Sequence, residues 1–183
     1  MEVKMVNDKQ EVKIFISYSH MNNKRAREFI AEFEDYIKPS KKYNYSVWYD
    51  KKLRVGKDFD PEILEHIASS ICIILLVSTS FLNSDYIKMN ELPAIFTGDK
   101  IVIPLLFRRI DFLRHDLGCL EGKQIYSFYN NGELKNGKSY TQLNGNQRDE
   151  YISEVYEKME EQLDEKFGQA VSDNSQKEVL QLV

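Results

Sequence analysis

Hydrophobic residues are grouped along this chain in two distinct patterns. Five short apolar runs, rich in β-branched, aliphatic and aromatic residues, predict strands. They occupy residues 12–17, 45–49, 71–77, 101–107 and 125–128. The third run is apolar throughout, as in a strand that is covered on both faces of a parallel sheet. Pro104 in the fourth run cannot donate a ladder hydrogen bond, which favours an edge position or a strand end.

Between and after these runs, hydrophobic residues recur at spacings of three and four, which predicts helices. The helical stretches are residues 26–37, 61–68, 85–96 and 147–167. Asn22 or Asn23, Asp60 and Ser84 are the predicted caps of the first three helices. Pro39 and Gly168 are predicted to end the first and the last helix, and Pro93 to kink the third.

Strands that alternate with helices predict an α/β fold with helices on both faces of a parallel sheet. For five strands we expect the flavodoxin-like, three-layer arrangement with strand order 2-1-3-4-5. In this order the chain reverses direction between strands one and three, so a ligand crevice should open at their carboxyl ends. Residues 17–22 and 78–84 therefore border the predicted site.

Composition narrows the classes of function. The chain has 183 residues and a net charge of −4, and its basic residues form only short runs, so a nucleic-acid surface is not indicated. Two cysteines make no disulfide framework, and no metal-ligand spacing joins them to the three histidines. No apolar run approaches the ~18 residues of a membrane span, so we expect a cytoplasmic protein without membrane contact.

The domain organisation that we expect is simple. Residues 1–11 form an N-terminal tail, residues 12–167 one domain, and residues 168–183 a tail or a linker to a missing region.

Glu91 and Ser84 are the candidate functional pair at the predicted crevice. They are seven positions apart, and at about 3.6 residues per turn both side chains would share one helix face. Tyr86, near the start of the same helix, offers a ring or a phenol to a base or a sugar. Ser84 is also explained as a helix cap, and a lone glutamate within a helix is usually solvated. No catalytic triad, glycine-rich phosphate loop or phosphoacceptor aspartate is evident.

Four segments resemble TIR (Toll/interleukin-1 receptor) domains, in the same order and at similar spacing. Residues 13–20 (KIFISYSH) are similar to the first box of the family, and residues 47–63 to its second strand and the following loop. Residues 73–92 resemble the third strand and helix of bacterial members, and residues 101–107 the fourth strand. The resemblance covers about residues 12–167.

The resemblance implies an enzyme that cleaves NAD+ between nicotinamide and ribose, giving ADP-ribose or a cyclic isomer. Glu91 would be the catalytic carboxylate. Eight residues would bind the substrate from the first strand, the mobile loop and the helix: Tyr18, Ser19, His20, Asp50, Lys51, Leu53, Ser84 and Tyr86. NAD+ is here the substrate, so no cofactor is expected. Bacterial relatives commonly serve anti-phage defence and are activated by TIR–TIR self-association, with a fused or separate sensor.

The expected cleavage reaction requires only one carboxylate. Glycosidic cleavage develops positive charge on the sugar, and a carboxylate held against the ribose stabilises that charge in the transition state. Nicotinamide leaves as a neutral molecule and needs no general acid.

Two other functions stay open at this point. The family often has tryptophan four residues before the glutamate, where this chain has Ile87 with Tyr86 beside it, and Pro93 follows closely. A non-catalytic TIR adaptor is therefore the first alternative. A nucleoside deoxyribosyltransferase-like enzyme, which shares the sheet topology and a carboxylate, is the second.

Overall fold

The predicted α/β class is confirmed, with a parallel sheet of four strands rather than five. A computed structural model of the chain describes residues 9–50, 61–128 and 137–180, with side chains described up to residue 168. The strand order is β2-β1-β3-β4, and all three pairings are parallel. The strands are β1 (Gln10–Tyr18), β2 (Tyr43–Trp48), β3 (Cys72–Val77) and β4 (Ile101–Leu106).

The predicted fifth strand at residues 125–128 is reduced to a single bridge. Tyr126 lies beside β4, donates to the Pro104 carbonyl at 2.8 Å and accepts from the Leu106 amide at 2.7 Å. Phe128 then pairs antiparallel with Lys138, so the segment leaves β4 after one residue. Pro104 lies on the edge strand as predicted. Its carbonyl faces Tyr126 rather than β3, so its missing N–H removes no bond between β3 and β4.

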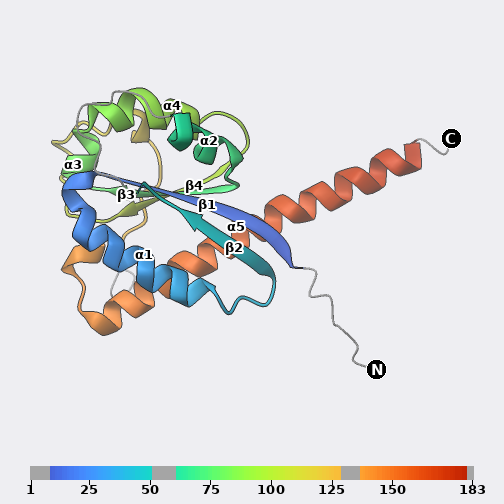
Figure 1. Cartoon of the computed structure of the whole chain (residues 1–183), viewed down its shortest axis with the longest axis horizontal. Coiled ribbons are helices and arrows are strands. Elements are labelled where there is room, and N and C mark those ends of the chain that lie inside the picture. The colour runs from blue at the N-terminus through green and yellow to red at the C-terminus, as the bar shows by residue number, and fades with distance from the viewer. Residues whose placement is uncertain (1–8, 51–60, 129–136, 181–183) are drawn as a thin grey trace.

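Helices cover both faces of the sheet (Figure 1). One face packs against α1 (Asn23–Ile37) and the long α5 (Gly145–Leu180), which places side chains such as Ile74 and Phe29 in one hydrophobic cluster. The other face packs against α2 (Pro61–Ser69) and α4 (Leu92–Ile95), with Ile73 and Ile67 in a second cluster. Successive β3 residues alternate between the two clusters, so this strand is buried on both faces, as its continuous apolar run predicts.

Short helical segments complete the described chain. The 3-10 turns are η1 (His20–Asn22), η3 (Gly118–Leu120) and η4 (Tyr140–Gln142), and the π-helical segment η2 (Ile87–Glu91) joins α4. The four-residue helix α3 (Thr79–Leu82) follows β3. None of the described helices is both long and apolar enough to cross a membrane.

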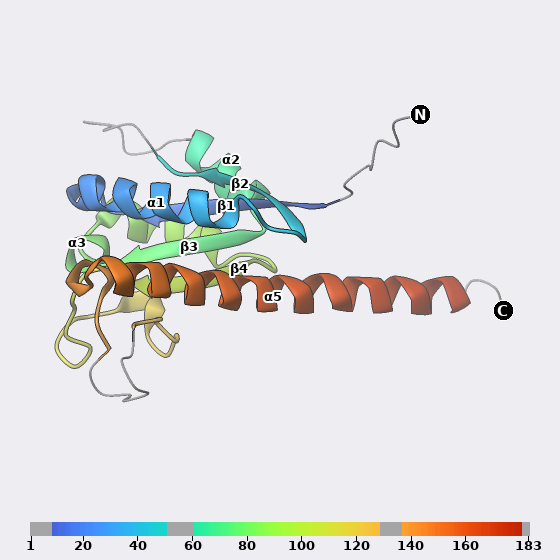
Figure 2. The same cartoon turned by 90° about the horizontal axis from the view of Figure 1, so that it is seen from below.

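One local prediction from the sequence is confirmed in position only, and another is wrong. Asn22 is the N-cap residue of α1, but its side chain makes no capping bond and contacts Ser78 and Arg108 instead. Gly168 does not end the last helix, which continues to Leu180 and projects beyond the sheet (Figure 2). Ser84 does cap the following helix, with its Oγ 3.3 Å from the Ile87 amide, whereas Asp60 lies outside the described residues.

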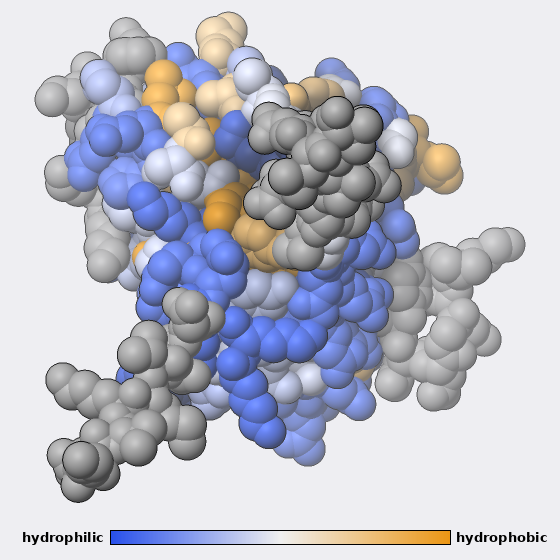
Figure 3. Space-filling view, turned by 90° about the vertical axis from the view of Figure 1, so that its right-hand side faces the viewer, coloured by the Kyte–Doolittle hydropathy of each residue, from blue (hydrophilic) through white to orange (hydrophobic). Residues whose placement is uncertain are grey.

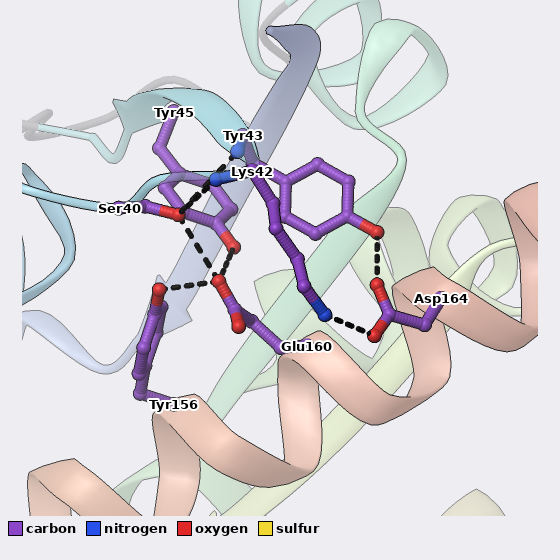
Figure 4. A network of polar contacts seen from close by, with 7 residues as sticks. All are labelled: Ser40, Lys42, Tyr43, Tyr45, Tyr156, Glu160 and Asp164. Atoms are coloured by element: carbon purple, nitrogen blue, oxygen red, sulfur yellow. Dashed lines mark hydrogen bonds and ion pairs between the residues drawn. The ribbon is translucent and has the colours of Figure 1, made fainter.

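Two acidic residues of α5, Glu160 and Asp164, fix the helix to the start of β2 and the residues before it (Figure 4). Asp164 accepts from the Tyr43 hydroxyl and pairs with Lys42, each at 2.6 Å. Glu160 accepts from the hydroxyls of Ser40 at 3.1 Å and Tyr45 at 3.3 Å, and also from Tyr156. This network adds polar contacts to the apolar packing of α5.

Candidate functional site

A pocket opens at the carboxyl ends of β1 and β3, where the strand order predicts the crevice. Its volume is about 140 Å³. β1 and η1 supply one wall, the end of β2 another, and α2 with the segment from Ser84 to η2 the rest. The lining residues are Phe15, Ile16, Ser17, Tyr18, Ser19, His20, Asp50, Ile63, Ser84, Tyr86, Ile87 and Glu91. The opposite end of the molecule, from which α5 projects, has a mainly hydrophilic surface over its described residues (Figure 3).

Glu91 is the buried carboxyl group of this pocket. Its side chain is held by Ser17, whose hydroxyl donates to the Glu91 Oε2 at 2.6 Å. Only 7% of Glu91 is exposed, and no ion pair joins it to a cation among the residues that the structure describes. A buried carboxyl group without a cationic partner is costly to ionise and is more frequent at functional sites than elsewhere.

The backbone that carries Glu91 departs from a regular α-helix. η2 is π-helical, and the Leu92 amide reaches back to the Ile87 carbonyl, five residues earlier. Pro93 follows Leu92 as the second residue of α4, and it has no N–H group to donate to the preceding turn. The structure therefore has a local widening of the helix beside Pro93, a feature often found at functional sites, and the predicted kink stays a prediction. Ser84 and Glu91 line the same pocket despite this irregularity.

The surroundings of Glu91 raise its pKa from 4.5 to about 7. Burial is the largest cause, because it penalises the charged form. The Ser17 hydrogen bond acts in the opposite direction, and the negative charge of Asp50 adds a smaller rise. The group is thus balanced between its protonated and ionised forms near neutral pH.

The second wall of the pocket is held by contacts between the ends of β1 and β2. The His20 Nε2 lies 3.3 Å from the Asp50 Oδ2. The Tyr18 hydroxyl donates to the Asp50 carbonyl at 2.8 Å, and burial raises the pKa of this phenol. These contacts fix His20 and Asp50 relative to β1, so a ligand in the pocket would meet an imidazole and a carboxylate in set positions.

The structure brings most of the predicted site residues together. Of the nine, seven line the pocket: Glu91, Tyr18, Ser19, His20, Asp50, Ser84 and Tyr86. Lys51 and Leu53 lie outside the described residues. The individual roles of the nine in substrate binding and catalysis stay predictions.

Ser17 is the residue that the sequence-based selection of site residues missed. It is a polar residue that follows the apolar residues 14–16 of β1, and it is 2% exposed. Its strand position puts it on the face that packs against α2 and α4, where η2 presents Glu91. The signal in the sequence was a serine placed directly after the apolar residues 14–16.

Aromatic rings support the floor of the pocket. Phe15 stacks on Trp48, its register partner in β2, with ring centroids 5.3 Å apart. Trp48 stacks in turn on His66 of α2 at 4.0 Å. This column fixes α2 against the sheet beside Ile63, which lines the pocket.

The polar groups of the pocket suit an organic ligand with hydroxyl groups and a cationic centre. Hydroxyl groups come from Ser19, Ser84 and Tyr86, and negative charge from Asp50 and the ionised form of Glu91. Among the described residues, no three or more His, Cys, Asp or Glu side chains are grouped as metal ligands. Cys72 is buried in β3 and Cys119 is an exposed free thiol, both remote from the pocket lining.

Comparison with known proteins gives two findings. A family model described as TIR domain matches residues 14–143 of the chain. The chain is also 30% identical over 122 residues to the uncharacterized protein y4lF of Sinorhizobium fredii (strain NBRC 101917 / NGR234). That match covers 61% of this chain but 36% of the relative, so the chain spans about a third of the relative's length.

Proposed function

Because the chain belongs to the TIR domain family, we propose that its pocket binds NAD+ and cleaves the bond between nicotinamide and ribose. The products would be nicotinamide and either ADP-ribose or a cyclic ADP-ribose isomer. The observation that carries the proposal is the burial of Glu91 in this pocket, 2.6 Å from the Ser17 hydroxyl and without a cation of the described chain.

A cationic substrate would complete the electrostatics of the pocket. The nicotinamide ring of NAD+ carries positive charge, and as the glycosidic bond breaks this charge passes to the ribose as an oxocarbenium-like centre. Ionised Glu91, with Asp50 nearby, would stabilise that centre from a buried position, where a charge interacts more strongly than in water. The cost of burying the carboxyl group in the free protein would then be recovered in the transition state.

The remaining lining residues are assigned to binding. Ser84 and Tyr86 would contact the ribose and the nicotinamide ring, and Ser19 and His20 would contact the substrate from the end of β1. Departure of neutral nicotinamide leaves C1′ open to attack. Water attack with loss of one proton gives ADP-ribose, whereas attack by a nucleophilic atom of the adenosine part of the same molecule, also with loss of one proton, gives a cyclic product.

The test is nicotinamide release from NAD+ at high protein concentration with a crowding agent. Wild type, Glu91→Gln and Glu34→Gln are compared, because Glu34 is exposed on α1 and undergoes the same change of charge. We expect release by wild type and by Glu34→Gln, and a loss of at least about 100-fold in Glu91→Gln, the size typical of removing one transition-state charge.

The outcome also separates the proposal from the adaptor alternative. Release that is equal in wild type and Glu91→Gln would refute the assignment of Glu91. Absence of release from wild type, with self-association or partner binding that Glu91→Gln leaves unchanged, would favour a TIR adaptor. Base exchange on deoxynucleosides without nicotinamide release would favour the deoxyribosyltransferase-like alternative.

A further inference from the structure

A second pocket lies at the carboxyl edge of the sheet and shares no lining residue with the NAD+ pocket. Its volume is about 380 Å³. The lining comes from η1, the first turn of α1, the residues after β4, and η4. The lining residues are Met21, Asn22, Lys24, Arg25, Arg108 and Thr141.

The charge of this pocket is wholly positive. Lys24, Arg25 and Arg108 line it, and no acidic residue does. Over the described ranges of the chain, none of these three cations forms an ion pair, although the protein has a net charge of −4. Cations that gather around one hollow without a counter-charge repel one another, and an anion in the hollow would relieve this repulsion.

Arg108 is held in place by a buried side chain. Asn22 is 5% exposed, and its Oδ1 accepts from the Arg108 Nη1 at 3.2 Å. The Asn22 Nδ2 donates to the Ser78 Oγ at 2.7 Å, and this fully buried hydroxyl also accepts from the Phe81 amide. The guanidinium is thus oriented by a chain of contacts from α3. Asn22 is its one side-chain partner among the residues that the structure describes, and a guanidinium has further N–H donors that could bind a ligand.

Two further features favour an anion. The first turn of α1, a helix of 15 residues, carries Lys24 and Arg25, and a helix start has positive partial charge. Thr141 adds a hydroxyl from η4, and its amide bonds to the Phe107 carbonyl at 3.1 Å, which fixes η4 beside Arg108. Planar guanidinium groups with amines and a hydroxyl match the oxygens of phosphate.

We propose that this pocket binds a phosphate-bearing anion, either inorganic phosphate or pyrophosphate or the phosphate groups of a nucleotide. Arg108, which Asn22 holds in position, would bind the anion directly, and Lys24 and Arg25 would supply additional positive charge. The site is separate from Glu91 and does not depend on NAD+ cleavage.

The test is calorimetric titration of the full chain with inorganic phosphate, pyrophosphate, ADP and adenosine at low ionic strength. Arg108→Gln is compared with Arg114→Gln, a matched control that removes an exposed arginine paired with Asp111 in another pocket. We expect saturable binding of pyrophosphate or ADP, none of adenosine, and affinity about ten-fold or more weaker in Arg108→Gln but unchanged in Arg114→Gln.

The probes distinguish the two sources of phosphate. Equal affinity for pyrophosphate and ADP assigns the site to inorganic anions, and stronger binding of ADP assigns it to a nucleotide. Equal affinities of Arg108→Gln and wild type, or equal losses in both arginine variants, would overturn the proposal. Loss of pyrophosphate binding in Glu91→Gln would also overturn it, because the anion would then occupy the first pocket.

Discussion

Burial and a second carboxylate nearby raise the pKa of a carboxyl group, whereas a hydroxyl that donates to it lowers the pKa. In the protein without a bound ligand, burial raises the pKa of Glu91 to about 7. The proposed chemistry needs the ionised form, so kcat/KM for NAD+ should rise as the pH increases through this value. The same burial sets the dependence of both activity and stability on pH.

The first prediction concerns the two neighbours of Glu91. Ser17→Ala removes the hydrogen bond that lowers the Glu91 pKa, so the acid limb of the kcat/KM profile should move to higher pH. Asp50→Asn removes the negative charge that raises it, so the limb should move to lower pH. Shifts of the two limbs in the same direction, or none, would show that another group controls the profile.

The second prediction concerns stability. The folded pKa of Glu91 lies above its ordinary value of 4.5, so the folded state binds more protons between pH 4.5 and 7. Ionisation of Glu91 therefore costs nothing below pH 4.5, and its full cost applies above pH 7. Glu91→Gln should raise the free energy of unfolding by up to about 3 kcal/mol at pH 8 and change it little at pH 4. Urea denaturation at both pH values measures this, and an equal effect at the two would exclude ionisation as the cause.

Most helices and strands of the described chain are predicted by local patterns of hydrophobic residues. The strands and helices follow from apolar runs and helical spacing because these segments bury continuous faces, as β3 and α1 do. Asn22 holds the N-cap position of α1 as predicted, but the sequence does not reveal that its side chain makes tertiary contacts in place of a capping bond. Pro93 follows the π-helical turn η2 closely, and helical periodicity alone does not predict a turn of this kind.

The third prediction tests the course of α5. Gly168 lies within this helix, and an added Cβ would meet no atom within 4 Å. Gly168→Ala should therefore stabilise the protein by about 0.5–1 kcal/mol through helix propensity. Gly98 is the control, because its φ of +82° disfavours any side chain, and Gly98→Ala should destabilise. Chemical denaturation measures both, and destabilisation by Gly168→Ala would mean that the helix ends at this residue.

At the scale of the whole molecule, the sequence predicts the α/β class, the parallel sheet and the position of the pocket. These follow from the alternation of elements and from the reversal between β1 and β3. The fifth strand was predicted wrongly, because a four-residue apolar run does not reveal that only Tyr126 pairs with β4. Ser17 was missed since its role depends on a contact across 74 residues of sequence.

The fourth prediction concerns assembly. Self-association is an expectation for a member of the TIR family, and we expect this domain to be weakly active as a monomer and to gain activity on oligomerising. The predicted contribution of residues 50–58 falls mostly on residues outside those that the structure describes. Specific activity per molecule should therefore fall on dilution, in parallel with the loss of oligomer measured by light scattering. Constant specific activity across the dilution series would contradict activation by self-association.

The central claim, that the Glu91 pocket holds the bond to be cleaved, is tested most directly by a crystal structure of Glu91→Gln with NAD+. This variant should bind the substrate without consuming it. Our account predicts the nicotinamide riboside end in the pocket, with the ribose facing residue 91 and between Ser17, Ser84 and Tyr86. NAD+ bound with this end elsewhere, while the pocket beside residue 91 holds only solvent, would contradict it.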